Sequence, residues 1–255
     1  KMSKIMKKDI VVGLGEIGLP IFKLLSKKIK IDGFDKIEKL NSNKFSNIKN
    51  IEFMHICIPF SKDFEKSVLQ LTKKFNPDGI VIHSTISPNT TKKLQTKLDL
   101  PIIYSATRGV HKRMLKDLKR YTKFFAVYNY APKSKWASRT FKNKLKKCGV
   151  KTKQLSQPIT LELAKVVCDT SYYGWLINFA QISKIIADKE NVDYDEMWSF
   201  TDEIQKFLKN RPKMFPGFIG GHCVIPNLDL VNDKSLNQIS SINNLFKKFL
   251  DSKSI

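Results

Sequence analysis

This 255-residue chain lacks several features that would narrow its class. It contains no run of about 18 apolar residues, so no transmembrane helix is expected. Its basic amino-terminal segment lacks the long apolar stretch and the small-residue cleavage site of a signal peptide. The four cysteines lie far apart without a CxxC pair. That pattern argues against a metal site and a disulfide framework, and it suits a reducing cytoplasm.

Arginine is also scarce, although the formal net charge is +23. A strongly basic chain suggests a nucleic-acid or anionic-membrane partner, or merely a lysine-coated surface. Proteins that read bases and phosphates rely on the planar fork of arginine. Here the basic residues are mostly lysines, they are scattered along the whole chain, and no nucleic-acid motif accompanies them. We expect no specific nucleic-acid partner and no membrane partner, whereas the positive field would attract a phosphorylated substrate or a dinucleotide.

What the chain does contain is a regular alternation of strand-like and helix-like segments. Its hydrophobic content of 42% is typical of a globular protein. The alternation predicts an α/β fold with a doubly wound parallel sheet. The expected strands are 9–12, 29–35, 53–58, 79–83, 101–104 and 123–128, with a short edge at 151–153; helices are expected at 62–75, 89–97 and 134–147.

A dinucleotide-binding fingerprint follows the first expected strand. The segment Gly13-Leu14-Gly15-Glu16-Ile17-Gly18 has the GxGxxG pattern, a helix-like run comes next, and Asp35 lies about 20 residues further on. The glycines allow a pyrophosphate to approach the backbone, and Asp35 would accept hydrogen bonds from ribose hydroxyls, which favours NAD over NADP. We therefore expect a Rossmann-type NAD-binding domain, with Gly13, Gly15, Glu16, Ile17, Gly18 and Asp35 as cofactor-binding residues.

Further site candidates follow other strands, because ligands of such sheets bind at the carboxyl ends of the strands. Pro59, Ser84 and Thr85 are expected at the cofactor. Arg108 and His111 are candidates for binding substrate anions, and the alternative for Arg108 is a loop with a capping arginine. His55 and Cys57 lie within a strand and are expected in the core. The NAD-binding domain is expected to span residues 1–156.

The second expected domain, residues 157–255, reads as mostly helical. A helix from about 159 to 189 carries apolar side chains on more than one face, as a spine between domains or subunits would. We expect a homodimer through this helix. Further helices are expected at 193–208 and 240–250.

A glycine-rich segment, residues 215–227, precedes the last expected helix. Gly217, Gly220 and Gly221 indicate a tight bend close to a ligand, and Cys223 follows His222 directly. Such a bend presents a thiol in a setting that favours the thiolate. The alternative is a glycine-rich loop before a buried cysteine. Phe218, Gly220 and Gly221 are candidate substrate contacts.

With these segments in order, the chain resembles the UDP-glucose/GDP-mannose 6-dehydrogenases, the nucleotide-sugar dehydrogenases, in a shortened form without their C-terminal nucleotide-binding domain. The resemblance rests on residues 13–20, 56–59, 84–91, 162–165 and 217–223. It implies two successive oxidations of a sugar C6 alcohol with two NAD. Cys223 would capture the aldehyde and carry the thioester, Lys165 would stabilise the oxyanion, and Thr85 would help to position water. A thiolate suits that role, and a lysine in a mostly apolar helix suits a polar site.

Two positions depart from the family pattern. Asp169 stands where the family has asparagine, and Asn227 stands where it has aspartate. The two changes together exchange an acid and an amide, which keeps one carboxylate in the site. The family's glutamate after the sixth strand has no clear match in residues 128–132.

Three functions follow from these patterns. The first is an NAD-dependent dehydrogenase of a sugar or nucleotide sugar that works through Cys223 and Lys165. The second is a single-step β-hydroxyacid dehydrogenase of the 6-phosphogluconate dehydrogenase superfamily, which has a helix lysine and needs no cysteine. The third is a non-catalytic NAD- or nucleic-acid-binding protein.

Overall fold

The computed structural model describes residues 7–41, 49–221 and 223–253. The chain divides into two compact units, Lys1–Leu163 and Ala164–Ile255, each of which is described by itself. None of the described helices combines the length and the apolar character that crossing a membrane requires.

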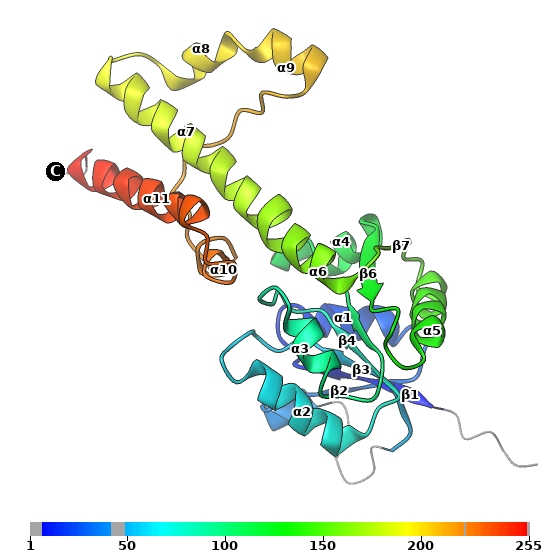
Figure 1. Ribbon diagram of the computed structural model, residues 1–255. Coiled ribbons are helices and arrows are strands. Elements are labelled where there is room, and N and C mark those ends of the chain that lie inside the picture. The colour runs from blue at the N-terminus through cyan, green and yellow to red at the C-terminus, as the bar shows by residue number, and fades with distance from the viewer. Residues whose placement is uncertain (1–6, 42–48, 222, 254–255) are drawn as a thin grey trace, which may run out of the picture. The chain divides into compact units, whose positions relative to one another are not determined.

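The first unit is built on one seven-stranded sheet with the order β2-β1-β3-β4-β5-β6-β7 (Figure 1). Its strands are β1 (Lys8–Val12), β2 (Ile31–Phe34), β3 (Ile51–Ile56), β4 (Gly79–Ile82), β5 (Ile102–Tyr104), β6 (Lys123–Val127) and β7 (Thr152–Gln154). The first five strands are mutually parallel, as the alternation of elements predicted. The fold is therefore the expected Rossmann-type sheet over these strands.

The sixth strand departs from the parallel arrangement, because β6 runs antiparallel to β5. The segment between them contains α4 (Met114–Arg120), which is only about 10 Å long. Because it is antiparallel, β6 begins beside the carboxyl end of β5. There the Lys123 ammonium donates hydrogen bonds to the carbonyl oxygens of Ser105 and Ala106, at 2.8 and 2.9 Å.

Helices cover both faces of the sheet, so its strands are apolar on both sides. One face is covered by α1 (Gly18–Leu25), α4 and α5 (Ser134–Lys147), whose buried side chains include Leu24, Leu118 and Phe141. The other face is covered by α2 (Phe64–Phe75), α3 (Thr90–Gln95) and α6 (Pro158–Leu163). Successive strand residues alternate between the two cores, as the pleat requires. Short 3-10 turns occur at η1 (Glu38–Leu40) and η3 (His111–Arg113).

The second unit is helical. It consists of η4 (Ala164–Ser171), α7 (Tyr172–Lys189), α8 (Tyr194–Ser199), α9 (Asp202–Leu208), α10 (Ile225–Leu228) and α11 (Lys234–Lys253). α7 packs against α11 at Gly174, where an added Cβ would lie 2.9 Å from Val224 and 3.0 Å from Ile239. The absence of a side chain at this glycine allows the close approach.

Three helices of this half differ from the expected ones, and one of them is α11, which was expected at 240–250 and spans Lys234–Lys253. The run expected at 159–189 is helical throughout, but residues Ala164–Ser171 form a π-helical segment. The helix expected at 193–208 is two helices, α8 and α9. Asp193 precedes α8, and its carboxylate accepts a hydrogen bond from the Glu196 N–H at 2.8 Å. That bond is the usual cap of a helix amino terminus.

Candidate functional site

The strand order reverses at the carboxyl ends of β1 and β3. From β1 the chain moves outward to β2 and then crosses back to β3 on the other side of β1. Ligands of doubly wound sheets bind at such a reversal of strand order. The glycine-rich loop follows β1 at this point, and Cys57, Ile58 and Pro59 follow β3.

The three fingerprint glycines have different roles. Gly13 has a φ of +88°, and an added Cβ would lie 2.9 Å from the Cys57 carbonyl oxygen. At Gly18 the Cβ would lie 1.6 Å from the Gly13 carbonyl oxygen, a distance no side chain tolerates. Gly15 is exposed, and no atom lies within 4 Å of an added Cβ. Folding therefore requires glycine at Gly13 and Gly18, whereas Gly15 leaves open space above the loop, as a pyrophosphate needs.

Asp35, one residue after β2, lies against this loop. Its Oδ2 accepts a hydrogen bond from the Leu14 N–H at 2.6 Å, and its Oδ1 accepts one from the Ile37 N–H at 3.0 Å. The carboxylate thus stands beside the turn where the fingerprint places the adenosine ribose.

His111 also lies against the glycine loop, although its position after β5 had suggested a substrate contact. Its Nδ1 is 2.9 Å from Oε2 of Glu16, the acidic residue within the fingerprint. Arg108 points elsewhere, since its guanidinium donates to the Thr122 carbonyl oxygen at 2.7 Å and lies over the Phe124 ring at 4.9 Å. This arrangement matches the alternative of a capping arginine.

A hydrogen bond joins the loops that follow β3 and β4. The Ser84 hydroxyl donates a hydrogen bond to the Ile58 carbonyl oxygen at 2.6 Å, and half-buried Thr85 comes next at the end of β4. The structure thus brings the fingerprint loop, Pro59, Ser84 and Thr85 to one edge of the sheet, because the parallel strands β1, β3 and β4 all end there.

Glu162 is a supporting residue whose role in the first unit the sequence reasoning missed. Its carboxylate is buried and accepts hydrogen bonds from the Asn89 and Thr91 N–H groups, at 2.6 and 3.0 Å. Burial raises the pKa of Glu162, and the hydrogen bonds partly oppose that rise. Glu162 thereby caps the start of α3 and holds the loop that begins at Ser84. In the sequence, Glu162 could have been noticed because it is the one charged residue of an otherwise uncharged helix.

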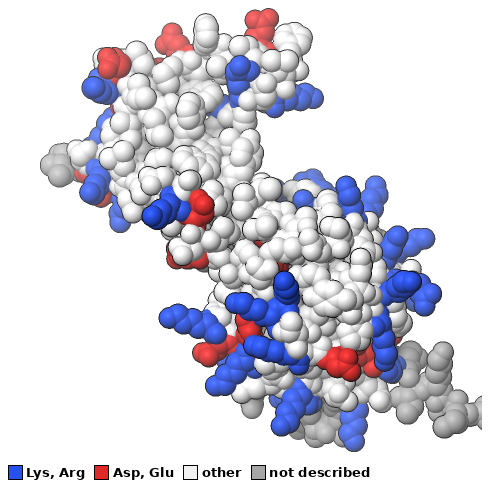
Figure 2. All heavy atoms as spheres, viewed as in Figure 1, with Lys and Arg blue, Asp and Glu red and all other residues white. Residues whose placement is uncertain are grey.

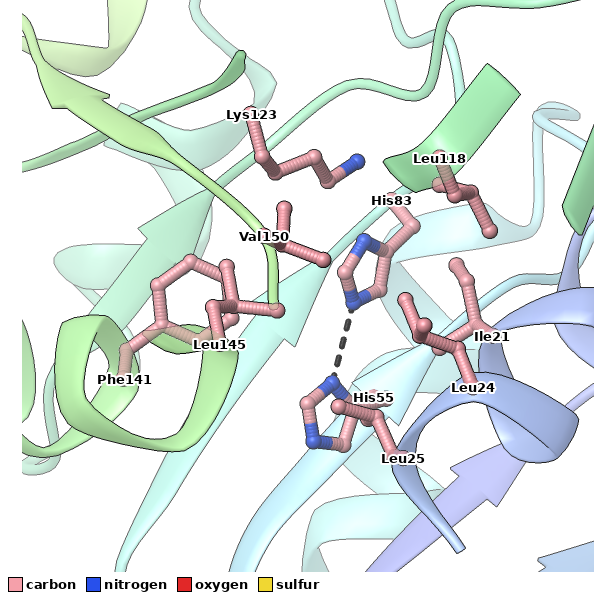
Figure 3. Close-up of a pocket in the computed structure, with 10 residues that line it drawn as sticks. All are labelled: Ile21, Leu24, Leu25, His55, His83, Leu118, Lys123, Phe141, Leu145 and Val150. Carbon is pink, nitrogen blue, oxygen red and sulfur yellow. Dashed lines mark hydrogen bonds between the residues drawn. The ribbon is translucent and has the colours of Figure 1, made fainter. Parts of the chain in front are cut away.

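A chain of buried ionisable groups lies against the sheet face that α1, α4 and α5 cover; Figure 3 shows two of its members, His55 and His83, beside Lys123. Nε2 of His55 is 3.2 Å from Oδ2 of Asp9, and Nδ1 of His55 is 2.9 Å from Nε2 of His83. Burial lowers the pKa of His83 well below 6.5, and the Lys123 ammonium adds to the effect. Burial alone would raise the pKa of Asp9, but His55 and Lys144 outweigh it and hold that pKa below its ordinary value.

The expectation that His55 and Cys57 belong to the core is confirmed for His55, which is buried in β3. Cys57 follows the strand and is half-buried, and burial raises its pKa to about 12. A thiol with such a pKa is inert at neutral pH.

In the second unit, Lys165 and Asp169 form an ion pair on the π-helical segment. Lys165 Nζ is 2.7 Å from Asp169 Oδ2, and the lysine side chain is only 14% exposed. The Thr170 hydroxyl donates to the Lys165 carbonyl oxygen, five residues earlier, at 3.1 Å. Short π-helical segments occur frequently at functional sites.

Cys223 lies in the same part of this unit. It is exposed and follows Gly221, whose φ of +73° suits glycine. The Asn227 amide donates to the Cys223 carbonyl oxygen at 2.5 Å, and α10, which contains Asn227, packs against η4. The second unit thus brings the segments of Cys223, Asn227, Lys165 and Asp169 together. His222 lies outside the described residues; Phe218 and Gly220 are exposed just before the turn.

Comparison with known proteins identifies the fold. No protein-family model and no curated protein matches the sequence. The chain is similar to a UDP-D-ManNAc dehydrogenase from Pyrococcus horikoshii (TM-score 0.76, 18% identity, covering 96% of this chain and 70% of that one). It is also similar to a UDP-N-acetyl-mannosamine dehydrogenase from Staphylococcus aureus (TM-score 0.73, 18% identity, 97% and 70%).

A third similar structure is a 3-hydroxyisobutyrate dehydrogenase from Mycobacterium tuberculosis, with a TM-score of 0.68 and 16% identity. That similarity covers 96% of this chain and 94% of the other. The chain therefore has the fold that nucleotide-sugar and hydroxyacid dehydrogenases share.

Proposed function

We propose that the protein is an NAD-dependent dehydrogenase that oxidises a primary alcohol of a sugar or nucleotide sugar toward the acid. One observation carries the cofactor assignment. The space that a side chain at Gly15 would occupy is empty, whereas Gly13 and Gly18 must be glycine because neighbouring atoms leave no room for a Cβ. The backbone N–H groups at the start of α1 would receive the pyrophosphate, and Asp35 would receive the ribose hydroxyls. Bound NAD would supply the hydride acceptor.

The chemistry assigned to the second unit is covalent. The Cys223 thiolate adds to the aldehyde formed in the first oxidation, which gives a thiohemiacetal. Loss of hydride from that carbon leaves a thioester, and water then cleaves the C–S bond to release the acid and the thiol. The Lys165 ammonium stabilises the oxyanion of each tetrahedral species, and Thr85 helps to position the water.

The exchanged acid and amide fit this arrangement. Asp169 holds the Lys165 ammonium by a 2.7 Å ion pair, and Asn227 holds the backbone of the cysteine turn through the Cys223 carbonyl. Asp169 therefore positions the cation, and Asn227 positions the nucleophile. Phe218, Gly220 and Gly221 would line the approach of the substrate.

A specific observation favours a second candidate, a single-step β-hydroxyacid dehydrogenase. The 3-hydroxyisobutyrate dehydrogenase matches over nearly its whole length, whereas the nucleotide-sugar enzymes match over about 70% of theirs. In this reaction Lys165 acts on one alcohol and Cys223 has no chemical role. A Cys223→Ser variant with full turnover would establish this candidate in place of the first.

The decisive assay counts NADH formed per substrate consumed across a panel of nucleotide sugars and simpler sugar acids. Two NADH per substrate support the thioester route, and one supports the single-step route. No turnover across the panel supports a non-catalytic NAD- or nucleic-acid-binding protein.

The cofactor site is tested separately by Gly15→Ala. The added Cβ meets nothing within 4 Å, so the melting temperature should stay unchanged while NAD affinity falls at least tenfold, because the methyl group occupies the pyrophosphate's position. Unchanged NAD affinity would contradict the assignment.

We also propose a homodimer formed through α7, in a reducing compartment such as the cytoplasm where Cys223 remains a thiol. α7 exposes Tyr172, Trp175, Phe179 and Ile186 at helical spacing, with Phe179 at 60% and Ile186 at 52%. A stripe of this kind marks an interaction surface. Sedimentation of Phe179→Glu should show a monomer, whereas Phe207→Glu on α9, which is also exposed, should leave the dimer intact. A monomeric unmodified protein would refute the proposal.

A further inference from the structure

The whole net positive charge of the chain belongs to the first unit. Residues 1–163 contain 35 Lys and Arg against 12 Asp and Glu, whereas residues 164–255 contain 11 of each. The net charges are therefore +23 and zero. A general preference for lysine would give both units a similar net positive charge. The difference in net charge therefore needs a cause within the first unit. The lysines look scattered along the sequence, and only the division into units shows where the excess lies.

Within this unit the excess concentrates on the helices of one sheet face. Figure 2 shows Lys and Arg side chains around the rim of the first unit, where they outnumber Asp and Glu. The helices α1, α4 and α5 contain a single acid, Asp117, which is buried and paired with Arg113 at 3.0 Å. The exposed basic residues on and just after these helices, which we call the basic face, are Lys23, Lys27, Lys28, Lys116, Lys119, Arg120, Lys135, Arg139, Lys142, Lys146 and Lys147.

α5 carries the most regular part of the basic face. Lys135, Arg139, Lys142 and Lys146 recur at i, i+4, i+7 and i+11, which aligns them along one side of the helix over about 16 Å. The opposite side buries Phe141 and other apolar residues. Like charges at this spacing repel and destabilise an isolated helix by a few tenths of a kcal/mol per pair. No acid on α5 offsets that repulsion, whereas on the other sheet face Glu65 pairs with nearby lysines.

The other two helices extend this stripe. α1 packs against α4, and Lys28 and Lys119 both lie close enough to Cys148, just after α5, for their charges to oppose the rise that burial causes in its pKa. Leu25 of α1, Leu118 of α4 and Leu145 of α5 line one cavity, so the three helices lie next to one another (Figure 3). The result is a continuous cationic surface rather than three separate helix ends.

We propose that the basic face binds the phosphate backbone of a nucleic acid without reading its sequence. The second unit has no net charge, so it offers a second copy of the chain no excess of acid to neutralise this face. Lysine forms point-charge contacts to phosphate and lacks the fork that reads base edges. Along α5, all of which the structure describes, no large apolar side chain is exposed. Membrane-surface helices use such side chains to enter the headgroup region, so their absence from α5 favours nucleic acid over an anionic bilayer.

The test is fluorescence anisotropy of a labelled 20-base-pair duplex of mixed sequence, with the full chain titrated at 50 to 200 mM KCl. The stripe variant replaces Lys135, Arg139, Lys142 and Lys146 with Gln. The matched control replaces four exposed lysines outside the basic face with Gln, and therefore removes the same net charge; these are Lys62, Lys66, Lys73 and Lys92. Each phosphate contact contributes about 0.9 to the slope of log K against log salt. The stripe variant should lose about 3 to 4 from that slope, and the control less than 1.

Three outcomes would overturn the proposal. The first is no duplex binding by the unmodified protein at 50 mM KCl. The second is an equal loss of slope in both variants, which would assign binding to net charge and not to this face. The third is tighter binding to vesicles containing 30% phosphatidylserine than to the duplex at equal salt, which would identify an anionic membrane as the partner. The proposal is independent of the dehydrogenase activity, because neither readout involves turnover.

Discussion

Protonation of His83 should destabilise the first unit as the pH falls. Burial and the Lys123 ammonium, with a contribution from His55, hold the pKa of His83 well below 6.5. The folded unit therefore keeps the imidazole neutral in a range where the unfolded chain protonates it. The unfolded state then binds more protons, so the free energy of unfolding decreases as the pH falls below 6.5.

The magnitude follows from a single proton. One group contributes at most about 1.4 kcal/mol per pH unit, which integrates to about 2 kcal/mol between pH 8 and pH 5. Glu162 acts in the opposite direction, because its pKa is raised and its stabilising contribution is lost as the pH rises above 4.5. Asp9 has a lowered pKa and titrates below 3.8, outside this window. The difference between the unmodified protein and His83→Gln isolates the histidine, since glutamine does not titrate.

The assay is urea denaturation at pH 8, 7, 6 and 5, followed by tryptophan fluorescence. In a Trp175→Phe, Trp198→Phe background the remaining tryptophan is Trp136, which stacks on Phe53 in the first unit at 5.3 Å. From pH 8 to pH 5 this background should lose about 2 kcal/mol more than the same background with His83→Gln. Parallel curves would refute the reasoning.

Three further substitutions test the support of the cofactor edge. Gly18→Ala should destabilise the first unit by more than 2 kcal/mol in the same urea assay, because its Cβ would lie 1.6 Å from the Gly13 carbonyl oxygen; a neutral effect would contradict the loop geometry. His111→Ala should weaken NAD binding severalfold in calorimetry by removing the imidazole that lies 2.9 Å from the Glu16 carboxylate near the pyrophosphate, and adding Glu16→Gln should restore the affinity; failure of that rescue would disprove the coupling. Glu162→Gln should cost about 1–3 kcal/mol, because one of two buried N–H groups loses its acceptor; hydrogen exchange at Thr91 as slow as in the unmodified protein would exclude that role.

The elements that the sequence predicts well are those whose own residues determine them. The helix over residues 134–147 was expected at the bounds observed for α5, because Ala137, Phe141 and Leu145 repeat on one side among basic residues. The first five strands were predicted because each is an apolar run bounded by turn residues. The fingerprint loop was predicted because its glycines are a local backbone requirement.

The features that were not predicted depend on contacts between distant segments. The antiparallel β6 is accompanied by hydrogen bonds from the Lys123 ammonium to carbonyl groups after β5, and no local pattern marks that contact. The Glu16–His111 pair joins residues 95 positions apart, and no local pattern marks either one as a partner. Glu162 caps α3 from more than 70 residues away. The assigned roles of Cys223, Lys165 and Thr85 remain predictions for the assays above.

The π-helical segment at Lys165 has a consequence for engineering this protein. A π turn holds one residue more than an α turn, so η4 sets the rotational phase of every side chain that follows it on α7. Deleting one residue from this segment would let it relax to α geometry and turn the α7 side chains about 100° around the helix axis relative to Lys165. The length of this segment, to a single residue, therefore determines the direction in which the exposed α7 side chains Tyr172, Trp175 and Phe179 point relative to Lys165.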